Sequence, residues 1–368
     1  LFIFRMIRQR TLQVPSLIMM GNHEENKWEN FERATGNKPN EVNIINGYYF
    51  ITVSPGDGQL NEMTMRATDK NQNKYAYIQE WLEARIIEAE TASPDKPIFV
   101  FQHHAVTGPE HDLYNMLCNH HRVVIFSGDT HDVNNHPLSI RQDGGFTWVH
   151  AGAICSEAEF NNTSEGLYVE ADDRGNVTIK TRDFTNNRWI ENQVWKFNVN
   201  KPTLYTEARR RPLAHAPFFA PDAEVRLTEV RPKSIVVEFD CPLIPDNQVN
   251  DIVYRYRYKL TKKKNGKVVK DLSEWADFCL YPPSRTKTIE FIGLEKATAY
   301  TLNIYGIDAW GKESKPLTAS FSTATIDTIP RKPINYVLHF DGSLKNEGTS
   351  PKEVKMFFLD SKPEIYDT

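Results

Sequence analysis

The sequence predicts two folds in one chain: an α/β domain that ends near residue 198 and an all-β sandwich that begins near residue 221. Strand and helix patterns alternate in the first part up to about residue 148, as in a parallel sheet with connecting helices, and hairpin patterns follow. Between about 221 and 326 only strand patterns appear, which is typical of a β-sandwich. The length of 368 residues also exceeds that of a typical single domain, so two or three domains are expected.

The composition is that of an ordinary globular protein, and it excludes several classes of function. Charged residues make up 25% of the chain and the net charge is −4, so no general affinity for nucleic acid or anionic membranes is expected. No apolar run approaches the ~20 residues that a membrane helix needs. The four cysteines show no CxxC spacing. Cys118 and Cys155 are predicted to be small core residues, whereas pairing of Cys241 with Cys279 stays open.

Residues 74–90 carry the clearest helical pattern of the α/β domain, because Ile78, Leu82 and Ile86 follow one another at intervals of four. A short helix is expected near 110–118. Strands are predicted from short apolar or alternating runs at 48–53, 98–101, 123–126, 166–171, 176–181 and 188–197. We therefore expect domain 1–198 to hold a parallel core that antiparallel strands complete.

A linker at 199–220 is predicted from its prolines and from the basic run 209–211. The β-sandwich is assigned to 221–328, with alternating strands at 234–239 and 252–260 and a last strand near 319–325. In the second of these, Tyr254, Tyr256 and Tyr258 share one face, which favours cross-strand packing over a sugar-binding surface. Residues 329–368 are expected to begin a further β domain.

Polar side chains follow three of the predicted strands at the point where each strand ends. The sequence Gly21 to Glu24 follows the apolar run 17–20, His103 and His104 follow 98–101, and the sequence Gly128 to His131 follows 123–126. Because the carboxyl ends of parallel strands meet at one edge of a sheet, we expect these side chains to converge there.

The side chains at these strand ends are those of a metal site. Asn22, His103, Asp129 and His131 offer hard or borderline ligands, which suit Mn, Fe, Zn or Mg rather than copper or iron–sulfur clusters. A divalent metal bound there could polarise a phosphoryl oxygen and lower the pKa of a bound water, as phosphate-ester hydrolysis requires.

The order of these blocks resembles the calcineurin-like metallophosphoesterase superfamily, which includes purple acid phosphatases and many nucleotidases and phosphodiesterases. The resemblance covers about residues 1–198, and its most specific part is the sequence GNHE at 21–24. It implies metal-dependent hydrolysis of small phosphate esters by a metal-bound hydroxide. Asn22 would bind a metal, His23 would contact the phosphate and assist the leaving group, and Glu24 would orient His23. His103 would be a metal ligand, and His104 a substrate-binding neighbour in the pocket.

The chain departs from the family's pattern in two places. The last block normally reads Gly-His-x-His, so Asp129 stands where a His is usual, while His131 matches the ligand of the first metal. The family also places Asp-x-His and Gly-Asp-x-x-Asp motifs before GNHE, and residues 1–20 contain no Asp and no His. We therefore expect an α/β domain that lacks its first strands and has impaired activity. Two metal ions, Mn, Fe or Zn, are expected in the complete enzyme.

The predicted sandwich resembles a fibronectin type III domain through the segment L-x5-Y-x-L-x-I at 294–304 and the D-x-W-G turn at 308–311. Such domains appended to hydrolases resemble the architecture of exported bacterial enzymes, so an extracytoplasmic location is expected, with glycan or protein contacts made through the sandwich.

Simpler interpretations apply to the remaining histidines. Metal binding is not expected of His120, His121 or His136, and His150 is predicted to be a core histidine with satisfied hydrogen bonds. His111 and Asp112 are expected to begin the short helix, where Asp favours the N-terminal dipole. The alternative function for the whole chain is that of a non-catalytic extracellular binding or surface protein with a degenerate phosphoesterase domain.

Overall fold

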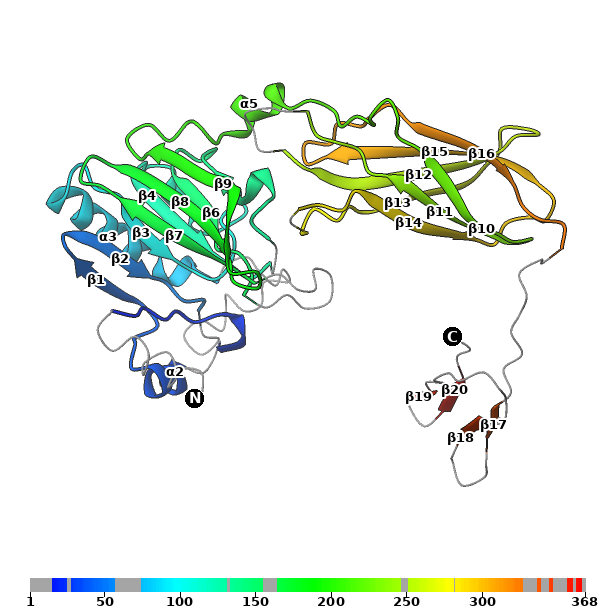
Figure 1. Cartoon of the computed structure of the whole chain (residues 1–368). Coiled ribbons are helices and arrows are strands. Elements are labelled where there is room, and N and C mark those ends of the chain that lie inside the picture. The colour runs from blue at the N-terminus through cyan, green and yellow to red at the C-terminus, as the bar shows by residue number, and fades with distance from the viewer. Residues whose placement is uncertain are drawn as a thin grey trace. The chain divides into compact units, whose positions relative to one another are not determined.

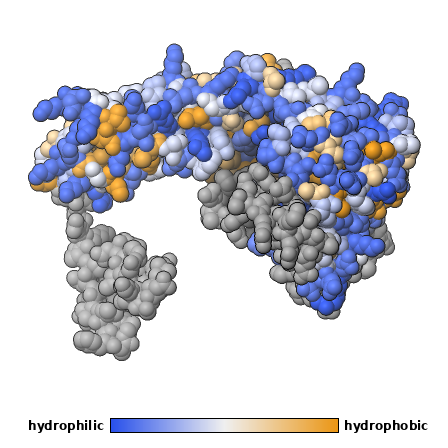
Figure 2. Space-filling model, turned by 180° about the vertical axis from the view of Figure 1, so that it is seen from behind, coloured by the Kyte–Doolittle hydropathy of each residue, from blue (hydrophilic) through white to orange (hydrophobic). Residues whose placement is uncertain are grey.

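The computed structural model describes residues 15–24, 28–56, 74–130, 133–154, 164–245, 251–280 and 282–326, and four short strands between 336 and 365. None of the helices in these ranges is long and apolar enough to cross a membrane. The face of the molecule in Figure 2 is mostly hydrophilic, with hydrophobic residues in small groups, as the mean hydropathy of −0.54 indicates.

A six-stranded sheet with the order β1-β2-β3-β4-β6-β5 forms the centre of the α/β region (Figure 1). Its strands are β1 (Glu41–Ile45), β2 (Tyr48–Thr52), β3 (Ile98–Phe101), β4 (Val123–Ser127), β5 (Ile140–Arg141) and β6 (Thr147–His150). β2, β3, β4 and β6 run parallel. Almost every residue of β3 and β4 is buried, which explains their uninterrupted apolar runs. Two of the predicted polar strand ends therefore meet at one sheet edge.

Helices cover one face of this sheet. They are η2 (Ala76–Ile78), α3 (Gln79–Ala92) and α4 (Tyr114–Leu117), whereas α2 (Trp28–Thr35) precedes β1 in the chain. The predicted stripe on α3 is buried and packs with inward residues of β3 and β4 such as Val100 and Ile125. The prediction that His111 and Asp112 begin the short helix is wrong, because α4 starts at Tyr114. Asp112 Oδ2 accepts hydrogen bonds from the backbone N–H groups of Tyr75 (2.8 Å) and Ala76 (3.1 Å), so Asp112 caps η2 instead.

An antiparallel sheet of β7 (Glu165–Ala171), β8 (Asn176–Asp183) and β9 (Arg188–Asn198) covers the other face (Figure 1). Phe99 and Val124 point to this side and share a core with Ile179 and Trp195. The predicted turn between β7 and β8 is present, and Gly175 adopts φ +79°, a conformation that glycine adopts without a steric penalty. The α/β region thus consists of helices, a mostly parallel sheet and an antiparallel sheet.

The predicted linker contains two short helices, α5 (Glu207–Arg210) and η4 (Arg211–Leu213). The Thr206 hydroxyl accepts a hydrogen bond from the Arg209 backbone N–H at 3.3 Å, which caps α5. Residues 199–220 are therefore partly helical, because a capping threonine precedes residues that favour helices.

The described residues from 225 to 322 form two sheets. One contains β10 (Val225–Val230), β11 (Ser234–Asp240) and β14 (Thr286–Ile292), and the other contains β12 (Val253–Lys262), β13 (Val268–Trp275), β15 (Ala299–Asp308) and β16 (Leu317–Ser322). Phe239 of β11 packs edge-on against Tyr256 and Tyr258 of β12, with ring centroids 5.3 and 5.9 Å apart. Both tyrosines are buried, so this face of β12 packs in a core as predicted.

Two predictions from short sequence features are wrong. Residues 17–20 belong to no sheet in the described part of the chain, although Met20 is buried, because an apolar run becomes a strand only where another strand pairs with it. Cys118 is exposed rather than buried, since it is the C-cap residue of α4, where the chain leaves the core. Cys241 and Cys279 are free thiols, and Cys155 lies outside the described residues.

Beyond the sandwich, β17 (Tyr336–Leu338) pairs with β18 (Leu344–Asn346), and β19 (Met356–Leu359) pairs with β20 (Lys362–Ile365). The chain forms two compact units, and the smaller one takes 227–237 and 289–299 from the sandwich together with 321–368. This division falls within the sandwich, so the boundaries at 199, 221 and 329 stay predictions.

Candidate functional site

The candidate site lies where β3 and β4 end. Phe101 and Phe126 are partners in the parallel register, so the residues that follow them leave the sheet side by side. Two backbone hydrogen bonds continue the ladder into the loops: Gln102 N–H donates to Phe126 C=O (3.0 Å), and Gly128 N–H donates to His103 C=O (2.9 Å). The loop after β3 and the loop after β4 are thereby held together.

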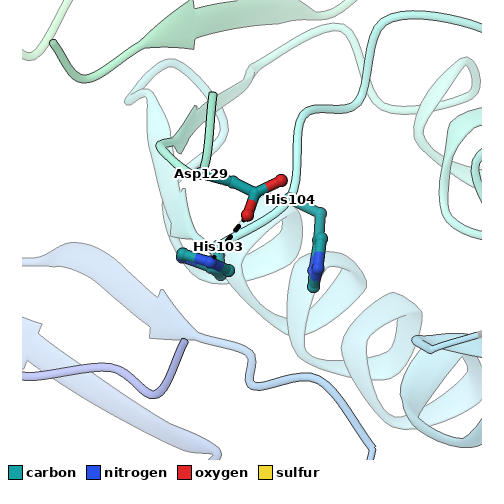
Figure 3. Close-up of side chains that lie close together, drawn as sticks. All are labelled: His103, His104 and Asp129. Carbon is teal, nitrogen blue, oxygen red and sulfur yellow. Dashed lines mark ion pairs between the residues drawn. The ribbon is translucent and has the colours of Figure 1, made fainter. Parts of the chain in front are cut away.

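Three side chains converge at this point (Figure 3). His103 Nε2 lies 3.0 Å from Asp129 Oδ1, and with His104 the ligand atoms of all three residues lie within 4.8 Å of one another. The side chains of His103 and Asp129 are 20% and 25% exposed, whereas His104 is buried. Two imidazoles and one carboxylate at this spacing form a partial ligand set for a divalent transition metal. We call these three residues the His103 cluster.

Asp129 stands in an unusual backbone conformation. Its φ is +72°, and Thr130 N–H donates to Gly128 C=O at 2.9 Å across it. A positive φ with a hydrogen bond that spans one residue describes a γ-turn of the strained kind. Such a conformation costs of order 1–3 kcal/mol and persists where the surroundings hold it in place. This turn aims the Asp129 carboxylate at His103.

His104 is fixed by Tyr75. The Tyr75 hydroxyl lies 2.9 Å from His104 Nδ1 and accepts a hydrogen bond from the His104 backbone N–H at 3.3 Å. Burial lowers the pKa of His104 to about 4; Asp129 opposes this, while Lys74 and any protonation of His103 or His111 add to it. His104 Nε2 is buried without a hydrogen-bond partner among the described residues. When Nδ1 donates its proton to the tyrosine, the lone pair on Nε2 is free for a metal.

His111 packs against Tyr75. Its ring stacks on Tyr75 with centroids 5.2 Å apart, and its Nε2 lies 3.2 Å from Gln102 Nε2. Burial lowers the pKa of His111 to about 4, so the ring is neutral at pH 7. His111 is therefore a neutral ring that packs against Tyr75.

The structure places the other predicted site residues as follows. Asn22 and His23 lie in η1 (Asn22–Glu24), where both are exposed, and the backbone of Glu24 belongs to the same turn. His23 is not part of the His103 cluster. His131 lies outside the described residues. Of the predicted metal ligands, His103 and Asp129 thus lie together, and the third member of the cluster is His104, for which a substrate contact was predicted.

The other histidines have local partners. His120 is buried between Glu90 and Glu83, at 3.2 and 3.8 Å. His136 Nδ1 accepts a hydrogen bond from Leu138 N–H at 3.0 Å and caps η3 (Pro137–Ser139). His150 is buried and hydrogen-bonded, as predicted for a core histidine. These three residues lie outside the His103 cluster.

Tyr75 was not predicted as a site residue. It lies just before the amphipathic helix, where an aromatic residue predicts only ordinary packing in the core. Only the fold brings it within reach of His104, which is 29 residues further along the chain. No pattern in the sequence could have indicated this contact.

The comparisons with known proteins agree with the chemistry of the cluster. Residues 1–133 match the family model described as calcineurin-like phosphoesterase, a span that includes all of the predicted site residues. No curated protein matches the chain. The family match indicates phosphoester hydrolysis as the general chemistry of the α/β region, and phosphoesterases of this kind generally bind divalent metals.

Among solved structures, the chain is similar to one reported as a myokine structure, at 20% identity, covering 30% of this chain and 98% of the other, with a TM-score of 0.21. It is also similar to the fn3 domain of the human collagen alpha-1(XX) chain, at 14% identity, covering 33% and 95%, with a TM-score of 0.22. At these TM-scores the two similarities carry no argument about this chain.

Proposed function

We propose that the α/β region is a metal-dependent phosphoester hydrolase whose metal is held at the carboxyl ends of β3 and β4. The observation that carries this proposal is the His103 cluster, where ligand atoms from two separate strand ends lie within 4.8 Å of one another. The match of residues 1–133 to the calcineurin-like phosphoesterase model supports the type of reaction.

The residues present suit a divalent metal. The side chains of His103 and Asp129 are partly exposed, and the buried Nε2 of His104 has no hydrogen-bond partner among the described residues. We assign metal binding to His103, Asp129 and His104, and also to Asn22 and His131, as the resemblance implies. A metal bound there would act as a Lewis acid on a phosphoryl oxygen.

The remaining residues act on the substrate and on one another. We assign to His23, exposed on η1, the contact with the phosphate and the transfer of a proton to the leaving oxygen, with Glu24 orienting its ring. Tyr75 holds the ring of His104 in place. Residues 1–20 contain no Asp or His that could serve as the ligands of the two upstream motifs, and we propose that hydrolysis by these 368 residues alone is slow.

The test is hydrolysis of bis(p-nitrophenyl) phosphate by the full 368-residue chain in the presence of Mn²⁺. We expect His103→Ala to lower the rate at least about 100-fold. His121→Ala, which changes an exposed histidine outside the cluster, serves as the matched control and keeps the rate. Equal rates for the wild type and His103→Ala would overturn the proposal. A folded, Mn²⁺-loaded chain with no hydrolysis at all would favour the alternative, a non-catalytic binding protein.

A further inference from the structure

A chain of hydrogen bonds runs away from the His103 cluster on the side of Asp129. Thr130, the next residue, places its Oγ1 2.8 Å from Nε2 of His150. His150 is the last residue of β6 and the register partner of Ser127, the last residue of β4. The loop after β4 is therefore tied through a side chain to the neighbouring strand, in addition to its backbone contacts with His103.

The partners of His150 define its protonation. The backbone N–H of Gly152 donates to His150 Nδ1 at 3.2 Å. A backbone N–H can only donate, so Nδ1 accepts and carries no proton. A neutral imidazole then carries its proton on Nε2, which must donate to Thr130 Oγ1. Thr130 thus receives a hydrogen bond of fixed direction.

Asn134 completes the arrangement around Nδ1. Its Oδ1 lies 3.3 Å from His150 Nδ1, which would bring two acceptors together, while its Nδ2 is buried without a partner among the described residues. The oxygen and nitrogen of an amide are assigned from the hydrogen bonds they make. When the Asn134 amide is turned over, its NH₂ group donates to His150 Nδ1. The contact between two acceptors is then removed, and the amide nitrogen gains a hydrogen-bond partner.

The far end of the chain of hydrogen bonds contacts the antiparallel sheet of β7, β8 and β9. Glu165, the first residue of β7, is buried and accepts a hydrogen bond from Asn134 N–H through Oε2 at 2.7 Å. Gly152 has φ +81°, a backbone conformation that favours glycine, and a Cβ there would also lie 2.7 Å from the end of the Asn134 side-chain amide. His150, Asn134 and Glu165 are all buried and have little freedom to move, and Thr130 lies at the exposed end of the arrangement.

We propose that His150 is a positioning residue for the metal site. Through Thr130, it holds the strained turn at Asp129 that directs the carboxylate toward His103. The inference rests on the proposed function, because it concerns the same site. His150 touches neither substrate nor metal, and its effect passes through the Thr130 hydroxyl and the backbone of the turn.

The experiment measures the Mn²⁺ dissociation constant of the full chain by calorimetry, with folding followed by circular dichroism. His150→Asn keeps an acceptor near Nδ1 but loses the donor at Nε2, whereas His150→Gln places an amide donor near the Nε2 position. We expect His150→Asn to weaken Mn²⁺ binding about tenfold and His150→Gln to recover most of it, because partners of metal ligands contribute about 10–100-fold to metal affinity.

Thr130 gives a second pair of variants that should fold, because its side chain is exposed. Thr130→Val removes the hydroxyl at nearly constant shape and should weaken binding about as much as His150→Asn, while Thr130→Ser should restore it. Wild-type affinity in both Thr130→Val and His150→Asn would overturn the positioning role. Equal losses in His150→Asn and His150→Gln would also overturn it, since they would show a packing effect only. Failure of the proposed function looks different: the wild type would then bind Mn²⁺ no better than His103→Ala.

Discussion

Two aspartates lie at or just beyond the end of a strand in different parts of this molecule, and their surroundings differ. Asp129 follows β4, and its carboxylate lies 3.0 Å from His103, which comes from a different strand. Asp308 ends β15, and its Oδ1 accepts hydrogen bonds from the backbone N–H groups of Trp310 (2.9 Å) and Lys312 (2.6 Å) of its own turn. A carboxylate that accepts hydrogen bonds from the backbone of its own turn stabilises the fold. One that lies beside a metal-ligand side chain from another strand can instead bind a metal.

The carboxyl group closest to Asp308 strengthens this contrast. Asp251 accepts a hydrogen bond from Ala309 N–H at 3.3 Å, and burial together with the charge of Asp308 raises the pKa of Asp251 to about 7. Desolvation and the neighbouring charge both favour the protonated form of Asp251. Asp251 therefore makes stability depend on pH, while the His103 cluster combines one carboxylate with two imidazoles.

The largest expected effect is the difference in Mn²⁺ affinity between variants of the two aspartates. Asp129→Ala should weaken Mn²⁺ binding by at least about 100-fold, because loss of a direct ligand exceeds the 10–100-fold effect of its outer partners. Asp308→Ala is the matched change outside the cluster and should leave the Mn²⁺ dissociation constant unchanged. Calorimetric titration of both variants checks this, and equal losses would remove the distinction between the two sites.

The free energy of unfolding of the same two variants should show the opposite order. Asp308→Ala leaves two turn N–H groups without their acceptor and should lower the free energy of unfolding by about 2 kcal/mol. Asp129→Ala relieves a strained turn less completely than glycine would, and should change stability by less than about 1 kcal/mol. Scanning calorimetry of both variants of the 368-residue chain measures these losses of stability. A larger loss for Asp129→Ala would mean that Asp129 is mainly structural.

A smaller effect is expected from the partner of His104. Tyr75→Phe removes the hydroxyl that lies 2.9 Å from His104 Nδ1 and should weaken Mn²⁺ binding about tenfold. Tyr49→Phe, another buried tyrosine of the α/β region, is the control and should bind as the wild type does. Unchanged affinity in Tyr75→Phe would exclude His104 as an oriented ligand.

The smallest effect concerns pH. The pKa of Asp251 is raised in the folded state, so its contribution to stability is complete at low pH and is lost as the pH rises toward about 7. Asp251→Asn removes this loss, and its melting temperature at pH 8 should exceed that of the wild type by about 3 °C, with little difference at pH 4. Asp222→Asn, at an exposed position, is the control. A wild type that gains stability over Asp251→Asn between pH 4 and 8 would contradict the assignment.

Much of the fold follows from local sequence. The predicted strands at 98–101 and 123–126 differ from β3 and β4 by at most one residue, because each is an unbroken apolar run of strand length that a polar residue follows. The run at 17–20 has the same character but forms no strand in the described chain, since pairing depends on neighbours that a local pattern does not contain.

The site was predictable only in part. Its location at the strand ends and two of its three members, His103 and Asp129, follow from sequence order, because parallel strands carry their polar ends to one edge. The place of His104 depends on which way its ring turns, and the contacts Tyr75–His104 and Thr130–His150 join residues that are 29 and 20 positions apart. Contacts of this kind arise from tertiary packing and leave no periodic signal in the chain.

The central claim is that the ends of β3 and β4 form a metal site, and a Mn²⁺ titration of the full chain beside its His103→Ala variant tests it most directly. The account predicts saturable binding by the wild type and a loss of at least about 100-fold in affinity for His103→Ala, with His121→Ala unchanged. Identical Mn²⁺ affinity in the wild type and His103→Ala would contradict it.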